Sequence, residues 1–377
     1  MPINKKFKIL VTGGAGFIGS FLVDKLVKFG HRVTIYDNLE TQVHPQGEPS
    51  YLNKDAKFIN ADVRDYSIFK KVILENEIIF HLAAAVGVAQ SQYEIKRYID
   101  VNIGGTANLL DILVNHKNRV KKIIVATSMT SYGEGKYHCS KCGIVRPEIR
   151  TERDIKKGWE PRCPNCQANI KPLPTDEDAL LKTNSIYSLT KQVQEQMMLN
   201  IGKTYNLPTI ALRLFNVYGP RQSLSNPYTG VTAIFISRVK NSHEPIIFED
   251  GLQTRDFTSV YDVIEVMKNI MHNEKAHYGI FNIGSGMPIT IRDLALKILQ
   301  ALDKKDIKVK ITGKFRKGDI RHCYANITKA KNILGFDPKV SFEKGLKDLI
   351  SWASDSVSSD HFEKAVHELK QKGLVEI

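Results

Sequence analysis

The start of the chain alternates between apolar runs and a helical repeat of apolar positions. Residues 7–12 form a short, mostly apolar run of the kind found in a buried parallel strand. Residues 21–28 carry apolar side chains at helical spacing, and Gly30 is placed to end that helix. Residues 31–36 form a second strand-like run. This order predicts a β-α-β unit, the building block of an α/β fold with a doubly wound parallel sheet.

The same periodicities recur near the other end of the chain. Residues 280–284 predict a late strand, and apolar side chains at helical spacing predict helices at 291–299 and 342–352. A final amphipathic helix is expected over 359–372. The chain therefore continues the α/β pattern and ends in a helical tail.

Three glycines, Gly13, Gly16 and Gly19, separate the first predicted strand from its helix. Phosphates bind backbone N–H groups at such a helix start, so the unit predicts a Rossmann-type dinucleotide site. Asp37 ends the second strand, where a carboxylate accepts hydrogen bonds from a ribose diol and repels a 2′-phosphate. NAD is therefore expected rather than NADP. The same aspartate also fits a simpler role, the opening of a turn at 37–39.

Tyr187 and Lys191 are four residues apart and share one face of a predicted helix. An ammonium group close to the Tyr187 phenol would lower a pKa that is normally about 10. A phenolate formed near neutral pH is a competent general base. Together with the glycine loop, the pair predicts redox chemistry on a hydroxyl group, with a hydride transferred to a nicotinamide.

Length, charge and apolar runs limit the class of protein. A chain of 377 residues can bury a sizeable core and is expected to form two lobes with elaborations. It has no secretory segment and no apolar run long enough to cross a bilayer, which predicts a cytoplasmic protein without membrane contact. The net charge of +14 comes from scattered basic residues, so nucleic-acid binding is not the favoured function.

Four of the five cysteines form two Cys-x2-Cys pairs separated by 20 residues: Cys139, Cys142, Cys163 and Cys166. This spacing predicts a structural zinc ribbon in which four thiolates leave no position for a catalytic water. Two disulfides are the alternative, and a reducing cytoplasm disfavours them. Because the segment is rich in basic residues, a nucleic-acid-binding ribbon on an inactive scaffold is the rival function. Its place inside the catalytic frame favours a flap or an oligomer contact.

Further motifs occur in a fixed order along the chain. They lie at residues 11–19, 61–65, 81–84, 102–106, 187–191, 213–220 and 255–257. With these motifs the chain resembles an extended short-chain dehydrogenase/reductase of the nucleotide-sugar epimerase/dehydratase family, from Lys6 to about Trp352 apart from the cysteine segment. The resemblance implies an enzyme with bound NAD, a nucleotide-sugar substrate and a homodimeric state.

The resemblance assigns roles to residues of each motif. The catalytic set is Ser128, Tyr187 and Lys191. The expected NAD-binding residues are Gly13, Gly16, Phe17, Ile18, Gly19, Asp37, Asn38, Asp62, Val63, Leu82, Ala83, Ala84, Asn102, Tyr187 and Lys191. Asn216, Arg255 and Arg316 resemble the family's ligands of the substrate diphosphate, for which bidentate arginine contacts suit the chemistry. Surface salt bridges are the simpler role for either arginine.

The residues after Ser128 distinguish the branches of the family. Dehydratases and decarboxylases that resemble this chain place carboxylates there, whereas this chain has Met129 and Thr130. Neither side chain replaces a carboxyl group as an acid. Oxidation at C4 followed by reduction remains, which predicts a 4-epimerase. A net nucleotide-sugar reductase is the alternative reaction.

The cysteine insertion also suggests the sugar. An insertion at this place resembles a subgroup of dTDP-L-rhamnose 4-epimerases, which make dTDP-6-deoxy-L-talose; a UDP-hexose or UDP-uronate is the alternative substrate. A 6-deoxy sugar presents a methyl group, so an apolar wall is expected in the substrate pocket. Val86, Val88 and Met129 are the candidates, although each also fits an ordinary core position.

The family resemblance implies a discontinuous organisation. Residues 1–215 and 256–284 are expected to form the NAD-binding Rossmann domain, with the zinc ribbon inserted at 134–175. The remaining predicted units are a smaller C-terminal substrate-binding lobe (216–255 and 285–353) and a helical tail (354–377).

Overall fold

A computed structural model of the protein describes residues 5–376, so the outermost parts of the predicted ranges, 1–4 and 377, lie outside the described residues. A seven-stranded sheet, entirely parallel, has the strand order β3-β2-β1-β4-β5-β9-β13. Its strands are β1 (Lys8–Thr12), β2 (Arg32–Asp37), β3 (Lys57–Asn60), β4 (Ile78–His81), β5 (Lys122–Ser128), β9 (Thr209–Leu214) and β13 (Ile280–Ile283). The order reverses direction between β1 and β4, where doubly wound sheets bind ligands beyond the carboxyl ends of their strands.

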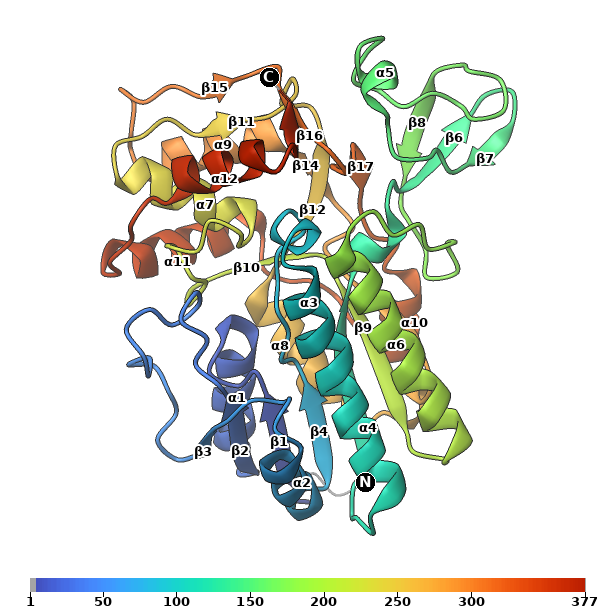
Figure 1. The fold of residues 1–377 in the computed structure, drawn as a ribbon, viewed down its shortest axis with the longest axis vertical. Helices are drawn as coiled ribbons and strands as arrows, with labels where there is room; N and C mark the ends of the chain where they lie inside the picture. Colours follow the sequence, from blue (N-terminus) through green and yellow to red (C-terminus); the bar gives the residue numbers. More distant parts are fainter. Residues whose placement is uncertain (1–4, 377) are drawn as a thin grey trace.

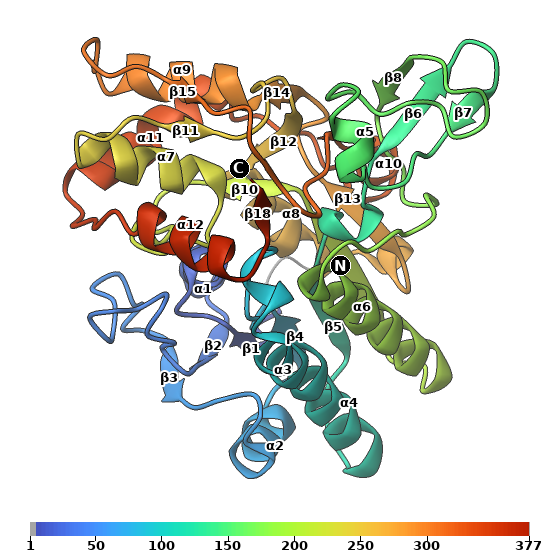
Figure 2. The ribbon, with the colours of Figure 1, turned by 45° about the horizontal axis from the view of Figure 1, so that its top comes forward.

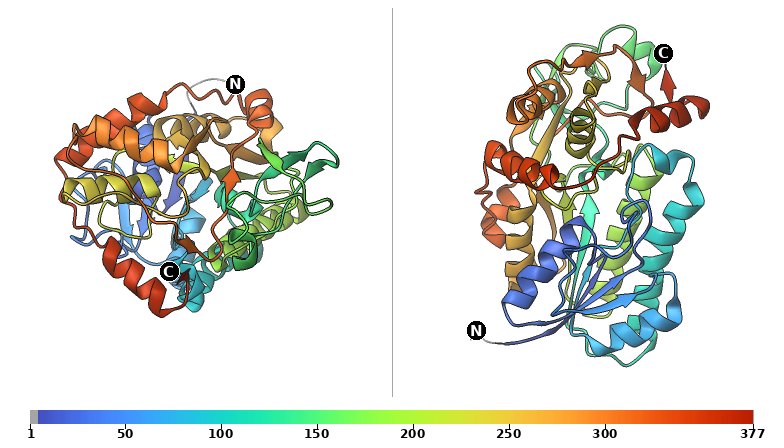
Figure 3. Two further views of the ribbon diagram at one scale, coloured as in Figure 1. Left: turned by 90° about the horizontal axis from the view of Figure 1, so that it is seen from above. Right: turned by 90° about the vertical axis from the view of Figure 1, so that its left-hand side faces the viewer.

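Helices cover both faces of this sheet, as the edge-on view in Figure 3 shows. Side chains alternate along β1: Ile9 and Val11 belong to one core and Leu10 belongs to the other. The first core contains α1 (Phe17–Lys28), α8 (Val260–Ile270) and α10 (Thr328–Leu334), and the second contains α2 (Tyr66–Glu75), α4 (Gly105–Asn115) and α6 (Ile186–Thr204). The predicted α/β fold with a Rossmann-type sheet is therefore confirmed.

The smaller lobe contains a second sheet and its own apolar core. Its strands are β10 (Asn216–Tyr218), β12 (Thr254–Ser259), β14 (Pro288–Thr290) and β17 (His322–Cys323), with a separate pair β11 (Ile246–Ile247) and β15 (Lys310–Ile311). Its helices are α7 (Val231–Lys240), α9 (Ile291–Ala301) and α11 (Phe342–Ser354). Outside this lobe, 3₁₀ turns lie at Gln90–Gln92, Met129–Tyr132 and Glu274–Ala276.

Two domain limits differ from the expected ones. Strand β12 pairs only with strands of the smaller lobe, so the chain returns to the Rossmann domain at α8 rather than at residue 256. Helix α10, expected in the substrate lobe, buries Ala330 and Leu334 in the core beneath the large sheet. Both domain limits depend on contacts with residues distant in sequence. The periodicity of strands and helices does not encode such contacts.

The cysteine insertion projects at the upper right of Figure 1, beside the substrate lobe. It contains a three-stranded antiparallel sheet, β7 (Gly143–Val145), β6 (Lys136–Cys139) and β8 (Ile170–Leu173), and a short helix, α5 (Glu152–Ile155). Its own core is small, with Tyr137, Val145 and Ile170 around the cysteines. Such a core is too small to hold a fold alone, which is why a metal ion is expected to contribute.

The tail folds back against the substrate lobe, and its helix lies beside α7 (Figure 2). Helix α12 (Phe362–Gln371) lies within the expected range, and the Phe362 N–H donates to the Asp360 carboxylate at 3.0 Å. The chain then turns at Gly373, with φ +68°, and adds β18 (Val375–Glu376) antiparallel to β16 (Phe315–Arg316). Within residues 5–376, helices long and apolar enough to span a membrane are absent.

Candidate active site and zinc-binding insertion

A cleft of about 610 Å³ lies at the carboxyl ends of the central strands. The Rossmann domain provides one wall through the loops after β1, β2, β4 and β5, and the substrate lobe provides the other. The tail helix α12 contributes Phe362, Val366 and Leu369 to the same lining. The volume and the two-lobed wall suit a ligand of the size of a dinucleotide with a substrate beside it.

The glycine loop brings backbone amides to one end of the cleft. Gly13 has φ +70°, and a Cβ atom there would lie 2.8 Å from the Ala83 nitrogen. Helix α1 begins after Gly16 without a side-chain cap, so its first N–H groups are free to bind a pyrophosphate. Asp37 lines the cleft and accepts from the Ala15 N–H at 3.0 Å. It also accepts from the Leu39 N–H at 2.9 Å, so the expected turn contact is present too.

All the other expected NAD contacts except Asn102 line this end of the cleft. They are Gly13, Gly16, Phe17, Ile18, Gly19, Asn38, Asp62, Val63, Leu82, Ala83, Ala84, Tyr187 and Lys191. Asp62 receives two hydrogen bonds of 2.8 Å from the Arg64 guanidinium and one of 2.9 Å from Asn38. The bonds from Arg64, the largest contribution, keep the pKa of the Asp62 carboxyl below its usual range. These amides, carboxylates and small side chains fit NAD.

Asn102 is fully buried and lies behind the cleft rather than in its lining. It sits in a π-helical turn, Ile99–Gly104, between α3 (Ile95–Tyr98) and α4. Its amide oxygen accepts from the Ala85 N–H at 2.8 Å. Its amide nitrogen donates to the Ala85 carbonyl at 3.1 Å and to the Thr190 hydroxyl at 2.9 Å. The Thr190 hydroxyl in turn donates to the Tyr187 carbonyl at 2.8 Å. Asn102 therefore joins the loop after β4 to the helix that carries Tyr187.

Ser128, Tyr187 and Lys191 all line the cleft. Ser128 ends β5, and α6 begins after Ser185, whose hydroxyl caps the Ser188 N–H at 3.1 Å. Burial raises the pKa of the Tyr187 phenol to about 12, and a hydrogen bond with Ser128 opposes this rise. Burial lowers the pKa of Lys191 to about 7.

The expected lowering of the Tyr187 pKa by Lys191 is wrong for the protein without ligands. Helical spacing places both residues on one face, but the Lys191 ammonium donates to the Ala126 carbonyl and to Gln194, each at 2.9 Å. It also contributes to the low pKa of His81, about 3, although burial of the imidazole is the main cause. An ionised Tyr187 therefore requires further positive charge in the cleft.

The three expected diphosphate ligands line the opposite wall, and their partners differ. Arg316 donates to the Asp319 carboxylate at 2.8 Å and lies over the Phe248 ring, while the Asn216 amide donates to the Asp256 carbonyl at 3.0 Å. Arg255 donates only to carbonyl oxygens, and within the described chain no carboxylate pairs with it. Burial lowers its pKa. Arg316 thus has an ion-pair partner, whereas Arg255 has none among the described residues.

The centre of the cleft has an apolar side. Val86, Val88 and Met129 all line it, and Met129 is almost fully buried. The Thr130 hydroxyl donates to Ser128 at 3.0 Å. Among described residues the carboxylates of the lining are Asp37, Glu40, Asp62 and Asp319. The first three belong to the cofactor end and the last pairs with Arg316, so the site lacks the acid that eliminating water across C5 and C6 would need.

The sequence did not point to several residues of the cleft. Gln222 and Gln253 are buried in its wall, and the Oε1 atom of each lacks a partner among the described residues. Such orphaned acceptors are suited to N–H or O–H groups of a ligand. Phe362, Val366 and Leu369 have the spacing i, i+4 and i+7, which identifies an apolar helix face but not what it covers.

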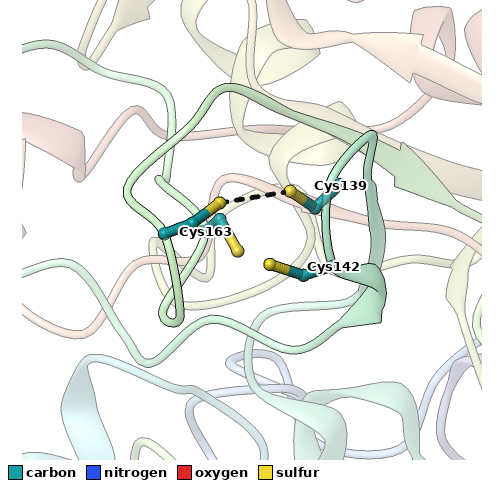
Figure 4. A group of neighbouring side chains, drawn as sticks. Cys139, Cys142 and Cys163 are labelled. Atoms are coloured by element: carbon teal, nitrogen blue, oxygen red, sulfur yellow. Dashed lines mark hydrogen bonds between the residues drawn. The ribbon is translucent and has the colours of Figure 1, made fainter.

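The four cysteines of the insertion converge on a common centre, as Figure 4 shows for Cys139, Cys142 and Cys163. Their sulfur atoms, with that of Cys166, all lie within 4.8 Å of one another, and Cys139 and Cys166 are 3.5 Å apart. Disulfides, with S–S distances of about 2.05 Å, are absent among the described cysteines. Tetrahedral zinc with Zn–S of about 2.3 Å requires sulfur separations of about 3.8 Å. The cluster fits a zinc ion bound by four thiolates.

Fold and site together define an enzyme of the Rossmann class with a tyrosine-lysine pair. Two family descriptions match the chain: "NAD dependent epimerase/dehydratase family" over residues 9–151 and "GDP-mannose 4,6 dehydratase" over residues 169–349. A dTDP-L-rhamnose 4-epimerase of Burkholderia thailandensis is 34% identical over 93% of this chain and 96% of that protein. The chain belongs to the NAD-dependent epimerase/dehydratase family, among the extended short-chain dehydrogenases/reductases.

Other relatives share this architecture. A putative UDP-glucose 4-epimerase of Methanocaldococcus jannaschii is 33% identical over 92% of this chain and 99% of that protein. The solved UDP-glucose 4-epimerase of Thermotoga maritima superposes with a TM-score of 0.76 and 32% identity, covering 92% of this chain and 98% of its own. The UDP-glucuronic acid 4-epimerase of Bacillus cereus was solved with UDP-glucuronic acid and NAD. It superposes with a TM-score of 0.73 and 27% sequence identity, covering 92% of this chain and 99% of that chain.

Proposed function

We propose that this protein is an NAD-dependent 4-epimerase of a nucleotide sugar, and that its substrate is dTDP-L-rhamnose. One observation carries the reaction type: Ser128, Tyr187 and Lys191 line the same cleft, and Met129 and Thr130 stand where a dehydratase needs carboxylates. The similarity to the Burkholderia dTDP-L-rhamnose 4-epimerase and the apolar wall of Val86, Val88 and Met129 support the sugar, because a 6-deoxy sugar presents a methyl group there.

In the proposed reaction, Tyr187 removes the proton from the C4 hydroxyl, and Ser128 hydrogen-bonds the same oxygen. NAD, when bound, supplies a hydride acceptor and donor together with a positive charge that favours an ionised phenol. The Arg255 guanidinium holds the diphosphate while the 4-ketosugar turns over in the cleft. Tyr187 then returns the proton to the oxygen of the inverted centre. Burial raises the pKa of the Tyr187 phenol, and the added positive charge would oppose that rise.

We also propose that zinc is structural and that the protein is a cytoplasmic homodimer. Ile95, Ile99 and Leu189 are exposed apolar side chains on neighbouring elements, α3, the π-helical turn and α6, whereas Met198 on the same α6 is buried in the core. Light scattering after size exclusion checks the dimer. A monomer at micromolar concentration contradicts it.

The first experiment is incubation of the purified protein, without added cofactor, with dTDP-, UDP- and GDP-sugars, followed by proton NMR. Conversion of dTDP-L-rhamnose to its C4 epimer supports both reaction and sugar. Turnover of a UDP-hexose or UDP-uronate alone keeps the reaction and replaces the sugar, an outcome that the Thermotoga and Methanocaldococcus relatives favour. Conversion only with added NADH identifies a net reductase.

A variant separates catalysis from folding in the same assay. Tyr187→Phe keeps the ring that packs near Tyr98 and removes only the proton acceptor. We expect a loss of turnover of at least about a thousandfold, with bound NAD unchanged. An active Tyr187→Phe enzyme would exclude this base. A protein that binds nucleic acid and lacks NAD would instead favour the zinc-ribbon binding role.

A further inference from the structure

The insertion is joined to the substrate lobe by charged side chains that are themselves buried. Arg321, one residue before β17, has no exposed side-chain surface, and Arg150 and Glu249 are 2% and 3% exposed. Arg150 belongs to the insertion, whereas Glu249 and Arg321 belong to the lobe. Buried ion pairs of this kind are costly to break, because removal of one partner leaves an uncompensated charge. The insertion is therefore fixed to the lobe in one orientation.

Glu160 of the insertion holds two consecutive side chains of the lobe. One carboxylate oxygen lies 2.8 Å from Nε and 2.7 Å from Nη2 of Arg321, and the other lies 3.0 Å from Nε2 of His322. The Thr254 N–H donates to Nδ1 of His322 at 3.2 Å, so Nε2 carries the hydrogen that points to Glu160. Glu160 lies three residues before Cys163, so a metal ion held by the four cysteines would restrain the segment that carries it.

The segment held by Glu160 is also the segment that orients Arg255. The Arg255 guanidinium donates to the Ile320 carbonyl at 2.7 Å and to the Arg321 carbonyl at 3.0 Å. Strand β17 pairs with β12, with Thr254 opposite His322 and Arg255 opposite Cys323. The direction of the Arg255 side chain in the cleft therefore depends on the backbone whose side chains Glu160 binds.

A second link from the insertion reaches the other arginine of the cleft. Arg150 donates to both oxygens of Glu249, at 2.9 and 3.1 Å, and to the Asp319 carbonyl at 3.2 Å. The Asp319 carboxylate accepts from Arg316 at 2.8 Å. Each arginine expected to bind the diphosphate is thus linked to the insertion through one intervening residue. That residue is Asp319 for Arg316 and Arg321 for Arg255.

We propose that the zinc-binding insertion orients the substrate-binding arginines, with Glu160 as the positioning residue for Arg255. This inference rests on the proposed function, because Arg255 is its diphosphate ligand. Glu160 does not line the cleft, so its effect on a ligand passes through Arg321, His322 and the carbonyls of residues 320 and 321. The role differs from that of a flap over the active site or an oligomer contact.

The test compares Glu160→Gln with Glu148→Gln by calorimetric titration of the zinc- and NAD-containing protein with dTDP and UDP. Glu148 is an exposed carboxylate of the same insertion that pairs with Lys182 and, among the described residues, makes no ion pair with the lobe's arginines. Removal of a negative charge near a diphosphate would by itself tighten binding. The proposal expects the opposite for Glu160→Gln, about three- to tenfold weaker binding of the nucleotide. Glu148→Gln should bind like the parent.

A double-mutant cycle separates positioning from a general loss of structure. In an Arg255→Met background the effect of Glu160→Gln on the Kd should disappear, because the side chain that it orients is gone. Zinc and NAD contents should stay at parent values in each variant. An unchanged Kd in Glu160→Gln, or an equal loss with and without Arg255, would overturn the proposal. If the parent bound neither nucleotide, the proposed function would fall and this inference with it.

Discussion

The insertion and the tail are both attached to the substrate lobe, and they are attached by different forces. The insertion relies on charged side chains: buried Arg150 and half-exposed Glu160 pair with buried Glu249 and Arg321 of the lobe. The body of the tail helix relies on an apolar cluster of Phe248, Phe362, Leu369 and Val375. Ionic partners fix direction as well as distance, whereas apolar packing depends mainly on volume. We infer that the charged attachment controls the orientation of arginines and the apolar one closes the cleft.

The tail is not free of charge pairs, but these lie at its start. Arg238 donates to Asp360 at 3.2 Å, with both side chains 5% exposed, before α12 begins. Farther along, the Tyr228 hydroxyl donates to Glu368 at 2.7 Å, and Tyr93 donates to Tyr228 at 2.7 Å. This chain of hydroxyls connects the Rossmann domain to the tail. The contrast with the insertion therefore concerns the main body of each attachment, which is charged for the insertion and apolar for the tail.

The largest effect is expected from loss of the metal. Cys163→Ser removes one buried thiolate, so the insertion should lose zinc and the small core around Tyr137 should loosen. We expect zinc content to fall from one ion per chain to near zero and stability to fall by about 4 kcal/mol or more. Metal analysis and thermal unfolding measure both. Cys323→Ala is the control, because Cys323 is buried outside the cluster and should leave zinc in place.

The charged attachment is tested directly at Arg321. Arg321→Met removes the cation of Asp250 and leaves Glu249 paired with Arg150 alone, at a cost of about 3–5 kcal/mol. Urea denaturation of the metal-containing protein gives the value. A loss under 1 kcal/mol would show that the buried charges do not hold the insertion, and the contrast with the tail would disappear.

The apolar attachment is tested at Leu369, which is 4% exposed. Leu369→Ala should cost about 2–4 kcal/mol through the cavity it leaves, and this cost should be insensitive to salt and pH. Val357→Ala on the same tail is the control, because Val357 is 82% exposed and should change stability by less than about 0.5 kcal/mol. Equal effects from the two variants would mean that the tail is not packed as described.

The smallest effect concerns pH. Burial alone would raise the pKa of Glu160, but hydrogen bonds and charges from His322 and Arg321 outweigh it and lower the pKa to about 2. The unfolded chain takes up this proton near pH 4.5, so the stabilisation is fully present above that pH and is lost as the pH falls towards 2. Since Glu160 is half exposed, we expect under about 1 kcal/mol between the parent and Glu160→Gln at pH 7. Urea titrations at pH 7, 4 and 3 should show this difference shrink, and a constant difference would refute the assignment.

Local patterns predicted much of the fold and part of the site. The run at 7–12, the three glycines and the helical spacing before Gly30 correspond to β1, the loop and α1. The late strand at 280–284 is β13, and it rejoins the large sheet through β9 as expected. These features follow from periodicities within a few residues, which sequence alone carries. The pKa of Tyr187 was predicted in the wrong direction, because helical spacing does not reveal where the Lys191 ammonium donates.

By itself the sequence determined that a dinucleotide loop, a Tyr-x-x-x-Lys pair and four zinc-spaced cysteines occur in one α/β chain. Only the tertiary structure decided what these parts do to one another. Arg255 meets a carbonyl 65 residues away, and Arg321 meets Glu160 across 161 residues. Such contacts, and the burial that shifts the pKa values of Tyr187 and Lys191, arise when distant segments pack together. No short-range pattern encodes them, because direction and desolvation are properties of the assembled core.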